Sequence, residues 1–525
     1  MWTGLLPYCV DFHTLMGRIL MFPATAIPVR ARLARLLAGH VRHVARTALY
    51  TLPLALGCML YGTPRAGAQV MDRDIGSAPS LLVSRPLPSH ATRKTTVPPF
   101  SEPEAVAPNP VSKWLRRRGI NFLVDNTNEF AGAITPPTRG STPGFSNYKQ
   151  GASNAGQYAM QLDMDWDKLA GWHGFATHMV TVGRYGTTAN RMFGDWLNHA
   201  SEDYGGGGNV VVHLVYAYGE ETLLGGRLAI AAGRMAEISD FAASPLFCNF
   251  QNGSICGRPK GITDTNFAAG YPASTWGFRV RGRPARSVYV QTGLYPIENG
   301  IYQVFQHRTG FKFNGANIIG YAAPIETAWE PVFRHGTLPG HYKFGAQLFS
   351  TPQSDNYLDV NDAPYGLTGR KQKQHGASWS TWVMFDQRLL HYHDKDSGLT
   401  ALSGVIYNDP RTSLRKYLVY AALLNRGAFR ARPYDTMGFA LTYTRIADGV
   451  TLAEQDMIDS GKRSSLPNHA TGVQRDTVVM EANYAIHVMP GVIFTPLFEY
   501  YIHPNAQSNL RDAALLGFKS HIQLM

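Results

Sequence analysis

The chain ends in the stretch 477-TVVMEANYAIHVMPGVIFTPLFEYYIHPNAQSNLRDAALLGFKSHIQLM-525, which decides the fold. Because successive side chains of a strand point to opposite faces, each part of this stretch has one apolar and one polar side. The apolar sides carry Val478, Met480, Ala482, Tyr484, Ile486 and Val488, and then Val492, Phe494, Pro496, Phe498, Tyr500 and Ile502. The other sides carry Glu481, Asn483, Ala485 and His487, and then Thr495, Glu499, Tyr501 and His503. Amphipathic strands of about ten residues, ended by turn residues, predict a transmembrane β-barrel.

Similar runs recur from residue 119 onward, separated by Gly, Pro, Asn and Asp clusters. They are 120–130, 156–166, 175–185, 210–220, 227–235, 275–283, 287–296, 316–329, 342–350, 377–388, 399–408, 414–425, 436–446, 477–488, 492–503 and 513–524. The run 210–224 also scores as a helix, but its β-branched residues and the preceding glycines favour a strand. We therefore predict an all-β, antiparallel transmembrane barrel of about 16 strands, an even number as in single-chain bacterial barrels.

The composition fits a wall exposed to lipid. Only 16% of residues are charged, against about 25% in typical soluble proteins, and 11% are aromatic. A secreted β-sandwich is the alternative, but it needs a coherent apolar interior, whereas the polar faces here hold Glu, Arg, His and Asn and fit a wet lumen. Of the net charge of +12, residues 1–68 contribute seven Arg and one Asp, or +6, which leaves +6 for the rest. With no basic stripe, nucleic acid is not an expected partner.

Residues 1–68 have the parts of a secretory signal: an Arg-rich start, the apolar run 47–62 and the small residues Ala66-Gly67-Ala68 before a cleavage point. Lipidation at Cys58 is the alternative, but the Leu expected three residues earlier is missing. Residues 69–113 are rich in Pro and Ser and are expected to form a periplasmic linker, so that residues 114–525 form the barrel.

Cys248 and Cys256 are the cysteines that remain after the leader. Eight residues apart and in an oxidising compartment, they are expected to form a disulfide in a loop outside the lipid zone. Metal binding is the alternative, but no nearby His or further Cys completes a site.

Three further motifs, in order along the chain, resemble the carbohydrate-selective porins of the OprB family. They are DWDKLAGWHG at 165–174, GGRLAIAAGRM with SDFAASPLFCNFQN and SICGRP between 225 and 259, and MPGVIFTPLFEYYIHPN at 489–505. SPLFCNFQN looks most like members from acetic-acid bacteria. The resemblance covers residues 114–525 and implies a sixteen-stranded pore in the outer membrane of a Gram-negative bacterium, which passes monosaccharides such as glucose without a cofactor. The chain departs from the pattern at its end, where Met525 stands in place of the usual terminal aromatic residue.

A sugar-selective pore needs fixed hydrogen-bonding groups and an aromatic surface at a narrow point. The candidate constriction residues are Arg184, Arg191, Trp196, Glu220, Arg234 and Glu237. Their charged groups are expected to face the lumen, and Trp196 is expected to offer a stacking surface on an inward loop. The alternative for each is a residue that only lines the hydrated wall or contacts lipopolysaccharide.

A general porin and a structural or adhesion barrel share this scaffold and remain alternatives. An enzyme is not expected: Asp163, Asp165 and Asp167 alternate on one strand, but the Gly-containing loop and distal Glu of a Ca²⁺ site are missing, and a glycosidase pair has no sequence signature. Expected partners are monosaccharides, lipopolysaccharide and outer-membrane lipid, the barrel-assembly machinery through the C-terminal strand, and, as one open oligomeric state, two further copies in a homotrimer. No metal is expected.

Overall fold

A computed structural model describes residues 110–135, 151–203, 211–263, 272, 274–298, 309–311, 318–393 and 397–524. All of them belong to one compact unit, Arg65–Met525. The predicted leader and the predicted linker as far as residue 109 lie outside the described residues. The first helix among the described residues, α4 (Pro110–Arg117), crosses the boundary expected between residues 113 and 114.

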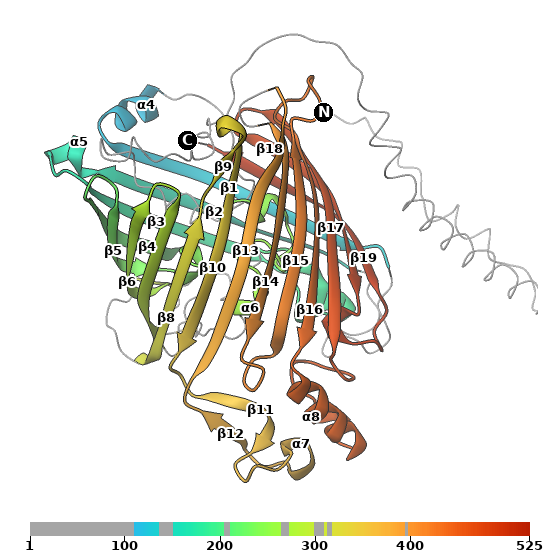
Figure 1. The fold of residues 1–525 in the computed structure, drawn as a ribbon. Coiled ribbons are helices and arrows are strands. Elements are labelled where there is room, and N and C mark those ends of the chain that lie inside the picture. The colour runs from blue at the N-terminus through green and yellow to red at the C-terminus, as the bar shows by residue number, and fades with distance from the viewer. Residues whose placement is uncertain are drawn as a thin grey trace, which may run out of the picture. The chain divides into compact units, whose positions relative to one another are not determined.

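The described chain forms one closed antiparallel barrel (Figure 1). Its sheet has 17 strands, of which the two-residue β9 (Val332–Phe333) only extends a turn, so 16 strands make the wall. The wall strands are β1 (Ile120–Ala133), β2 (Ala152–Asp165), β3 (Phe175–Gly186), β4 (His213–Leu223), β5 (Leu228–Met235), β6 (Thr275–Ala285), β7 (Val288–Glu298), β8 (Ile318–Trp329), β10 (Leu338–Phe349), β13 (Ser378–His391), β14 (Gly398–Asn408), β15 (Arg415–Arg426), β16 (Thr436–Ile446), β17 (Asp476–Met489), β18 (Val492–Ile502) and β19 (Ala513–Gln523).

The barrel closes between its first and last strands. β1 pairs with β19 from Asp125 opposite Gln523 to Ala133 opposite Leu515. Each of the sixteen predicted runs corresponds to one wall strand, and the ambiguous run at 210–224 is the strand β4. The predicted fold is therefore confirmed.

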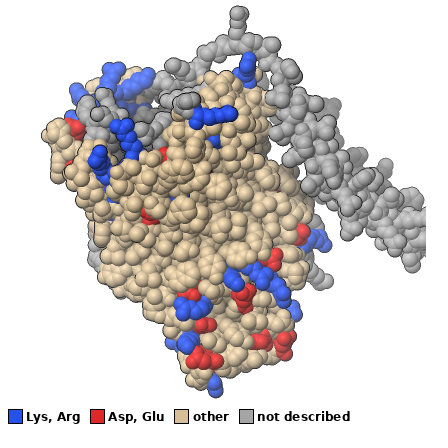
Figure 2. Space-filling view, viewed as in Figure 1, with Lys and Arg blue, Asp and Glu red and all other residues tan. Residues whose placement is uncertain are grey.

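The alternation predicted for the last strands is present in the burial of their side chains. Thr495, Leu497 and Glu499 are buried inside the barrel, whereas Phe494 and Phe498 are exposed on its outer face. The outer surface in Figure 2 is a broad band with few charges, and most Lys, Arg, Asp and Glu side chains lie near its two ends. This is the pattern of a wall that faces lipid.

Aromatic side chains border this band at both ends. At one end Tyr342 packs against Trp329, with ring centroids 5.3 Å apart, and against Phe385 at 6.0 Å. At the other end Trp379 packs against Tyr407 at 5.7 Å, and Tyr417 packs against Tyr443 at 6.0 Å. Such girdles mark the two membrane–water boundaries of a transmembrane barrel.

Glycines on the inner face give large rings room to lie across neighbouring strands. A Cβ on Gly345 would stand 2.2 Å from the ring of Trp382, which is directly opposite on β13. A Cβ on Gly404 would stand 2.6 Å from the ring of Tyr420 on β15. Part of the high glycine content is therefore explained by aromatic packing inside the wall.

The two ends of the barrel differ in their connections. At the turn end the links are short, such as residues 286–287 and 490–491, and α4 and the chain's C-terminal strand end lie here (Figure 1). At the loop end the links are long, such as residues 236–274 and 447–475. In bacterial barrels short turns face the periplasm and long loops face the outside.

The remaining elements lie in these connections. They are α5 (Trp166–Ala170), η1 (Ala189–Phe193), η2 (Glu237–Ser239), η3 (Phe247–Asn249), α6 (Lys260–Thr263), η4 (Arg334–Gly336), β11 (Gln353–Asp359), α7 (Tyr365–Thr368), β12 (Gln372–His375), α8 (Asp448–Asp459), η5 (Arg463–Ser465) and η6 (Pro504–Ala506). Among the described residues no helix is long and apolar enough to cross a membrane.

The hairpin β11–β12, α7 and α8 form a lobe that projects from the loop end (Figure 1). Glu454 on α8 is fully buried in this lobe, and one of its carboxylate oxygens accepts a hydrogen bond of 2.6 Å from the backbone N–H of Gln474. Burial raises the pKa of Glu454 to about 8. The folded lobe therefore favours the protonated form of this side chain.

We predict that the lobe loosens as the pH rises. Because the pKa of Glu454 is raised in the folded state, its favourable contribution is complete below its ordinary value of 4.5 and is lost as the pH passes through about 8. Hydrogen exchange in α8, corrected for the intrinsic pH dependence, should increase over this range. The variant Glu454→Gln should abolish the increase and the control Asp459→Asn should retain it; an unchanged pH response in Glu454→Gln would contradict the assignment.

Candidate pore constriction

The connection between β5 and β6 turns into the barrel. We call its residues 236–263 the lumen loop. Its Ala242 N–H donates to Glu326 on β8 (2.9 Å), and the Asn252 amide donates to Tyr501 on β18 (2.6 Å). Figure 1 shows α6 of this loop within the ring of strands. Contacts with opposite walls mean that the lumen loop crosses the interior and narrows it.

Charged side chains of the wall satisfy the backbone of the lumen loop. Glu481 on β17 accepts from the N–H groups of Gln251 (2.9 Å) and Asn252 (2.8 Å). Lys519 on β19 donates to the carbonyls of Cys248 (3.4 Å) and Phe250 (3.2 Å). Because buried backbone groups need hydrogen-bond partners, these charged side chains of the wall stabilise the lumen loop inside the barrel.

A disulfide between Cys248 and Cys256 closes the middle of the lumen loop. Both residues are buried, at 1% and 2% exposure. The pair lies in a loop, as predicted, and that loop is inside the barrel, away from the wall that faces lipid. The cross-link restricts the loop's conformations to those near its docked form.

The lumen loop also has an apolar seat. Phe250 and Phe247 are 0% and 1% exposed, and Phe247 meets Tyr420 edge to face with ring centroids 5.5 Å apart. The inner faces of β13–β16 supply most of the other side of this cluster, including Trp382, Met384, Leu402, Ile406, Leu418, Leu424 and Ala440. Our expectation of a polar, wet lumen is therefore wrong for this sector, which forms a packed core worth about 1.5–3 kcal/mol per buried large side chain.

The β3–β4 connection folds inward as well and packs on the lumen loop. The N–H of Gly253 donates to the carbonyl of His199 (2.8 Å), and Lys260 pairs with Glu202 (3.1 Å). The Gln251 amide donates to the carbonyl of Ala200 (3.0 Å). The two connections thus form one unit inside the barrel.

The predicted residues Glu220 and Glu237 are both inside and both paired. Glu237 accepts two hydrogen bonds from Arg258, of 2.9 and 3.0 Å, within the lumen loop. Glu220 on β4 pairs with Arg279 on β6, which also binds Asp240 of the lumen loop. Glu237 and Glu220 are 0% and 3% exposed, so the structure uses them to fix the lumen loop.

Arg184 likewise holds an inward connection. Its guanidinium pairs with Asp203 (3.0 Å) and donates to the carbonyl of Glu202 (3.0 Å), and the side chain is buried. Burial raises the pKa of Asp203, and Arg184 opposes this effect. The contact of Arg184 with sugar stays a prediction, but its observed partners belong to the protein.

Arg191 and Trp196 are half-buried in the same connection. The Arg191 guanidinium lies 4.9 Å from the indole centroid of Trp196. His469, from the β16–β17 connection, stacks on that indole with ring centroids 3.9 Å apart. Trp196 is therefore on an inward connection, as expected, but one aromatic face is already covered by protein.

Arg234 does not face the lumen. Within the sheet it stands opposite Trp276 on β6, and the next outward residue of that strand, Phe278, is 43% exposed. Arg234 lies over the Trp276 ring (5.7 Å) and pairs with Glu298 (2.8 Å). The expectation failed because the charge was assumed to face water, whereas here a buried ion pair compensates it on the outer side.

Three arginines of β6 were not among the predicted site residues. Arg279, Arg281 and Arg283 alternate along this strand and share its inner face. Arg281 and Arg283 lie 5.1 and 5.5 Å from the ring centroid of Tyr289 on β7, and both remain half-buried. The alternation in the sequence RVRGR was the available signal, since three arginines on the outer face would meet lipid.

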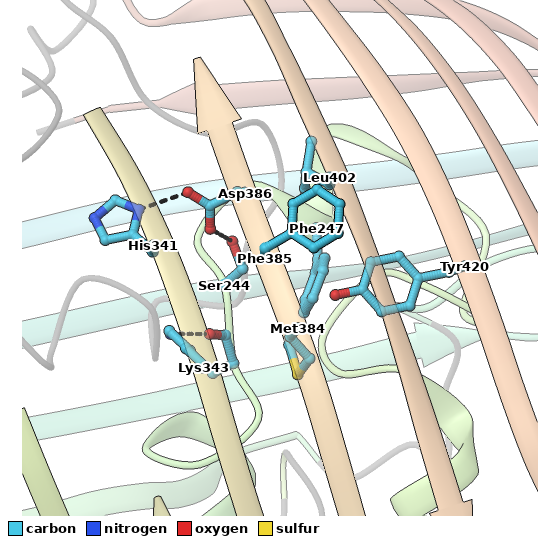
Figure 3. A pocket seen from close by; sticks show the side chains of 10 residues that line it. Ser244, Phe247, His341, Lys343, Met384, Phe385, Asp386, Leu402 and Tyr420 are labelled. Atoms are coloured by element: carbon cyan, nitrogen blue, oxygen red, sulfur yellow. Dashed lines mark hydrogen bonds and ion pairs between the residues drawn. The ribbon is translucent and has the colours of Figure 1, made fainter. Parts of the chain in front are cut away.

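A small pocket opens between the tip of the lumen loop and the wall (Figure 3). Asp386 on β13 bonds His341 on β10 and accepts from the Ser244 hydroxyl (3.3 Å). Lys343 donates to the carbonyl of Ala243 (2.5 Å). The polar side of the pocket faces apolar residues that include Phe247, Met384 and Tyr420, so it offers donors, acceptors and an apolar surface together. No group of three His, Cys, Asp or Glu side chains suited to a metal is found among the described residues.

A closed sixteen-stranded barrel with a lipid-facing band and inward-folded loops defines the class of porins. Residues 149–524 match the family model of the carbohydrate-selective porin, OprB family. The chain belongs to this family, which is a family of channels and not of enzymes, and the resemblance stated from the sequence is confirmed.

Relatives and solved structures agree with this assignment. The chain is 26% identical over 449 residues to Porin B of Pseudomonas aeruginosa, covering 79% of this chain and 92% of that protein. It is 26% identical over 405 residues to the putative porin QuiX of Acinetobacter baylyi, covering 75% and 88%. A high-pH structure of Pseudomonas putida OprB shares the fold with a TM-score of 0.72 at 24% identity, covering 80% of this chain and 99% of that one.

We predict that Arg258→Met loosens the lumen loop. The change leaves the buried Glu237 carboxylate without its ion pair, which typically costs about 3–5 kcal/mol. Single-channel recordings should show a larger and noisier conductance than the wild type. The double variant Arg258→Met with Glu237→Gln should recover much of the original conductance, and Arg411→Met, whose side chain is 57% exposed, should leave it unchanged. Equal effects of Arg258→Met and Arg411→Met would contradict the anchoring role.

Proposed function

We propose that this protein passes monosaccharides such as glucose across the outer membrane by facilitated diffusion, through a lumen narrowed by its inward loops. The observation that carries the proposal is the group of Arg281, Arg283 and Tyr289 on the inner wall, together with the narrowing by the lumen loop. Membership of the carbohydrate-selective porin family supports it. Export to the periplasm through the leader at residues 1–68 is part of the same proposal.

The chemistry of this wall suits a sugar. Guanidinium groups donate to hydroxyls, and those of Arg281 and Arg283 are half-buried on the inner wall, where the buried ring of Tyr289 lies beneath them. Carboxylates provide acceptors: Glu330 pairs with Arg283 at 2.7 Å. Burial opposes ionisation of Glu330, but Arg283 lowers its pKa below the ordinary value, so the carboxylate is charged at neutral pH.

The pairing of these charged groups with protein partners is expected to make their binding of sugar weak. Arg281 donates to Gln291 (2.8 Å), and Tyr289 donates to Glu326 (2.7 Å), so each group has a protein partner before sugar arrives. A sugar would exchange these contacts for its own at small net gain. Because the net binding free energy is small, the sugar can leave the site again, as conduction through a pore requires.

We predict that Arg281→Ala and Arg283→Ala slow glucose entry into proteoliposomes by roughly fivefold each, the effect of losing a contact of about 1 kcal/mol. Liposome swelling measures the rate, and glucose block of single-channel current measures binding. Arg411→Ala, at the loop end, is the matched control and should behave as the wild type. Heat-modifiable migration in detergent should be the same for all variants, because these side chains do not pack the lipid face.

Two outcomes would redirect the proposal. Equal permeation by glucose, amino acids and salts would make the protein a general porin. Absence of permeation by any solute from a correctly folded barrel would favour a structural or adhesion role.

A further inference from the structure

The motif DWDKLAGWHG has no part in the lumen. It forms the turn between β2 and β3 at the turn end of the barrel. Asp165 caps α5 by accepting from the N–H of Asp167 (3.1 Å), and Gly171 ends the helix in a left-handed conformation (φ 73°). This turn projects Trp172, which is 57% exposed and stacks on Phe175 with ring centroids 4.3 Å apart.

The helix α4 lies directly beside this turn. The N–H of Asp165 donates to the carbonyl of Gly119 (2.7 Å), just after α4 ends. Arg116 anchors the helix to the barrel by donating to Asn121 on β1 (3.0 Å). We call residues 110–118 and 166–172 together the α4–α5 corner.

The α4–α5 corner exposes apolar and basic side chains together. Val111 and Trp114 are 54% and 50% exposed, and Leu169 of α5 is 37% exposed. The basic residues of the corner are Lys113, Arg116, Arg117, Arg118 and Lys168. Arg118 lies 3.9 Å from the ring centroid of Trp114, and Figure 2 shows Lys and Arg side chains gathered over α4.

The acidic residues of this region do not cancel the positive charge. Asp165 is 2% exposed and is engaged by Lys168 (3.6 Å), while Asp167 bonds His173. Lys113, Arg117 and Arg118 are exposed. A surface of this kind attracts phosphate-bearing lipid headgroups, at about fivefold in affinity per basic residue.

We propose that the α4–α5 corner is an interfacial anchor that seats on anionic phospholipid headgroups of the leaflet at the turn end. Trp with Lys or Arg is the combination found at membrane–water boundaries, with the ring at headgroup level and the charge on phosphate. The site continues the lipid-facing wall, since Met160 on the adjoining β2 is 43% exposed on the outer face. Short turns place this end on the periplasmic side, where the leaflet consists of phospholipid.

The test places a fluorophore in the α4–α5 corner of the full chain. Cys9 and Cys58 are replaced by Ser, the Cys248–Cys256 disulfide is retained, and Val111→Cys is labelled with bimane. The protein is reconstituted into vesicles of phosphatidylethanolamine with increasing phosphatidylglycerol and a small, constant fraction of phosphatidylcholine that carries a doxyl quencher near the headgroup. The label should be quenched, and the quenching should weaken in high salt or when phosphatidylcholine replaces phosphatidylglycerol.

Charge variants separate the proposal from mere proximity to lipid. Lys113→Gln, Arg117→Gln and Arg118→Gln combined should raise the phosphatidylglycerol fraction for half-maximal quenching by at least about fivefold. Lys371→Gln with Lys373→Gln, at the loop end, is the matched control and should not shift it. A label at Val360→Cys, 57% exposed on the loop-end lobe, should remain unquenched.

Two results would overturn the anchor. One is a label at position 111 that stays unquenched in every lipid mixture while the barrel migrates as folded. The other is quenching that is insensitive to phosphatidylglycerol, salt and the triple variant, which would mean contact without headgroup recognition. Glucose permeation should be unchanged in the triple variant, so failure of the anchor is distinct from failure of the proposed transport.

Discussion

The lumen loop depends on one constraint: peptide groups that cross the inside of a barrel must find hydrogen-bond partners there. In this protein the wall provides them through long charged and amide side chains. Glu481 and Glu326 accept from loop N–H groups, while Lys519 and Lys343 donate to loop carbonyls. The loop is thus held on several walls at once, and its position in the pore is set by strands that are far apart in sequence.

The same constraint explains the charge distribution of the lumen. A lone charge in such a confined space would be costly, but each of these charges meets a backbone dipole or an opposite charge. Where the wall carries Leu402, Ile406 and Leu418 instead, the loop presents Phe247 and Phe250. The polar sectors of the wall therefore contact polar groups of the lumen loop, and the apolar sector contacts its apolar side chains.

The strands could be predicted from local sequence patterns, but the paths of the loops could not. Period-two alternation is a property of neighbouring residues, so β17 and β18 could be recognised from their own side chains. The inward turn of the lumen loop is set by Glu481 and Lys519, which follow it by more than two hundred residues, and no local pattern records such pairings.

The candidate site shows the same division. Arg184, Glu220 and Glu237 lie inside the barrel, but no local pattern in the sequence indicates their partners, so a residue that anchors a loop could not be distinguished from one that contacts sugar. Arg234 was placed on the wrong side because its partner Glu298 lies on another strand. Arg281 and Arg283, by contrast, have a local signal in their alternation along β6.

Lys519 has a further consequence for how the protein is made. It joins Glu129 on the first strand (3.1 Å) to the carbonyls of the lumen loop, and it stands on the last strand. Because Glu129 and Lys519 lie on the two strands that close the barrel, the link from Glu129 through Lys519 to the lumen loop is complete only when these strands have paired. The pairing that closes the barrel therefore also brings together part of the set of contacts that hold the lumen loop inside it.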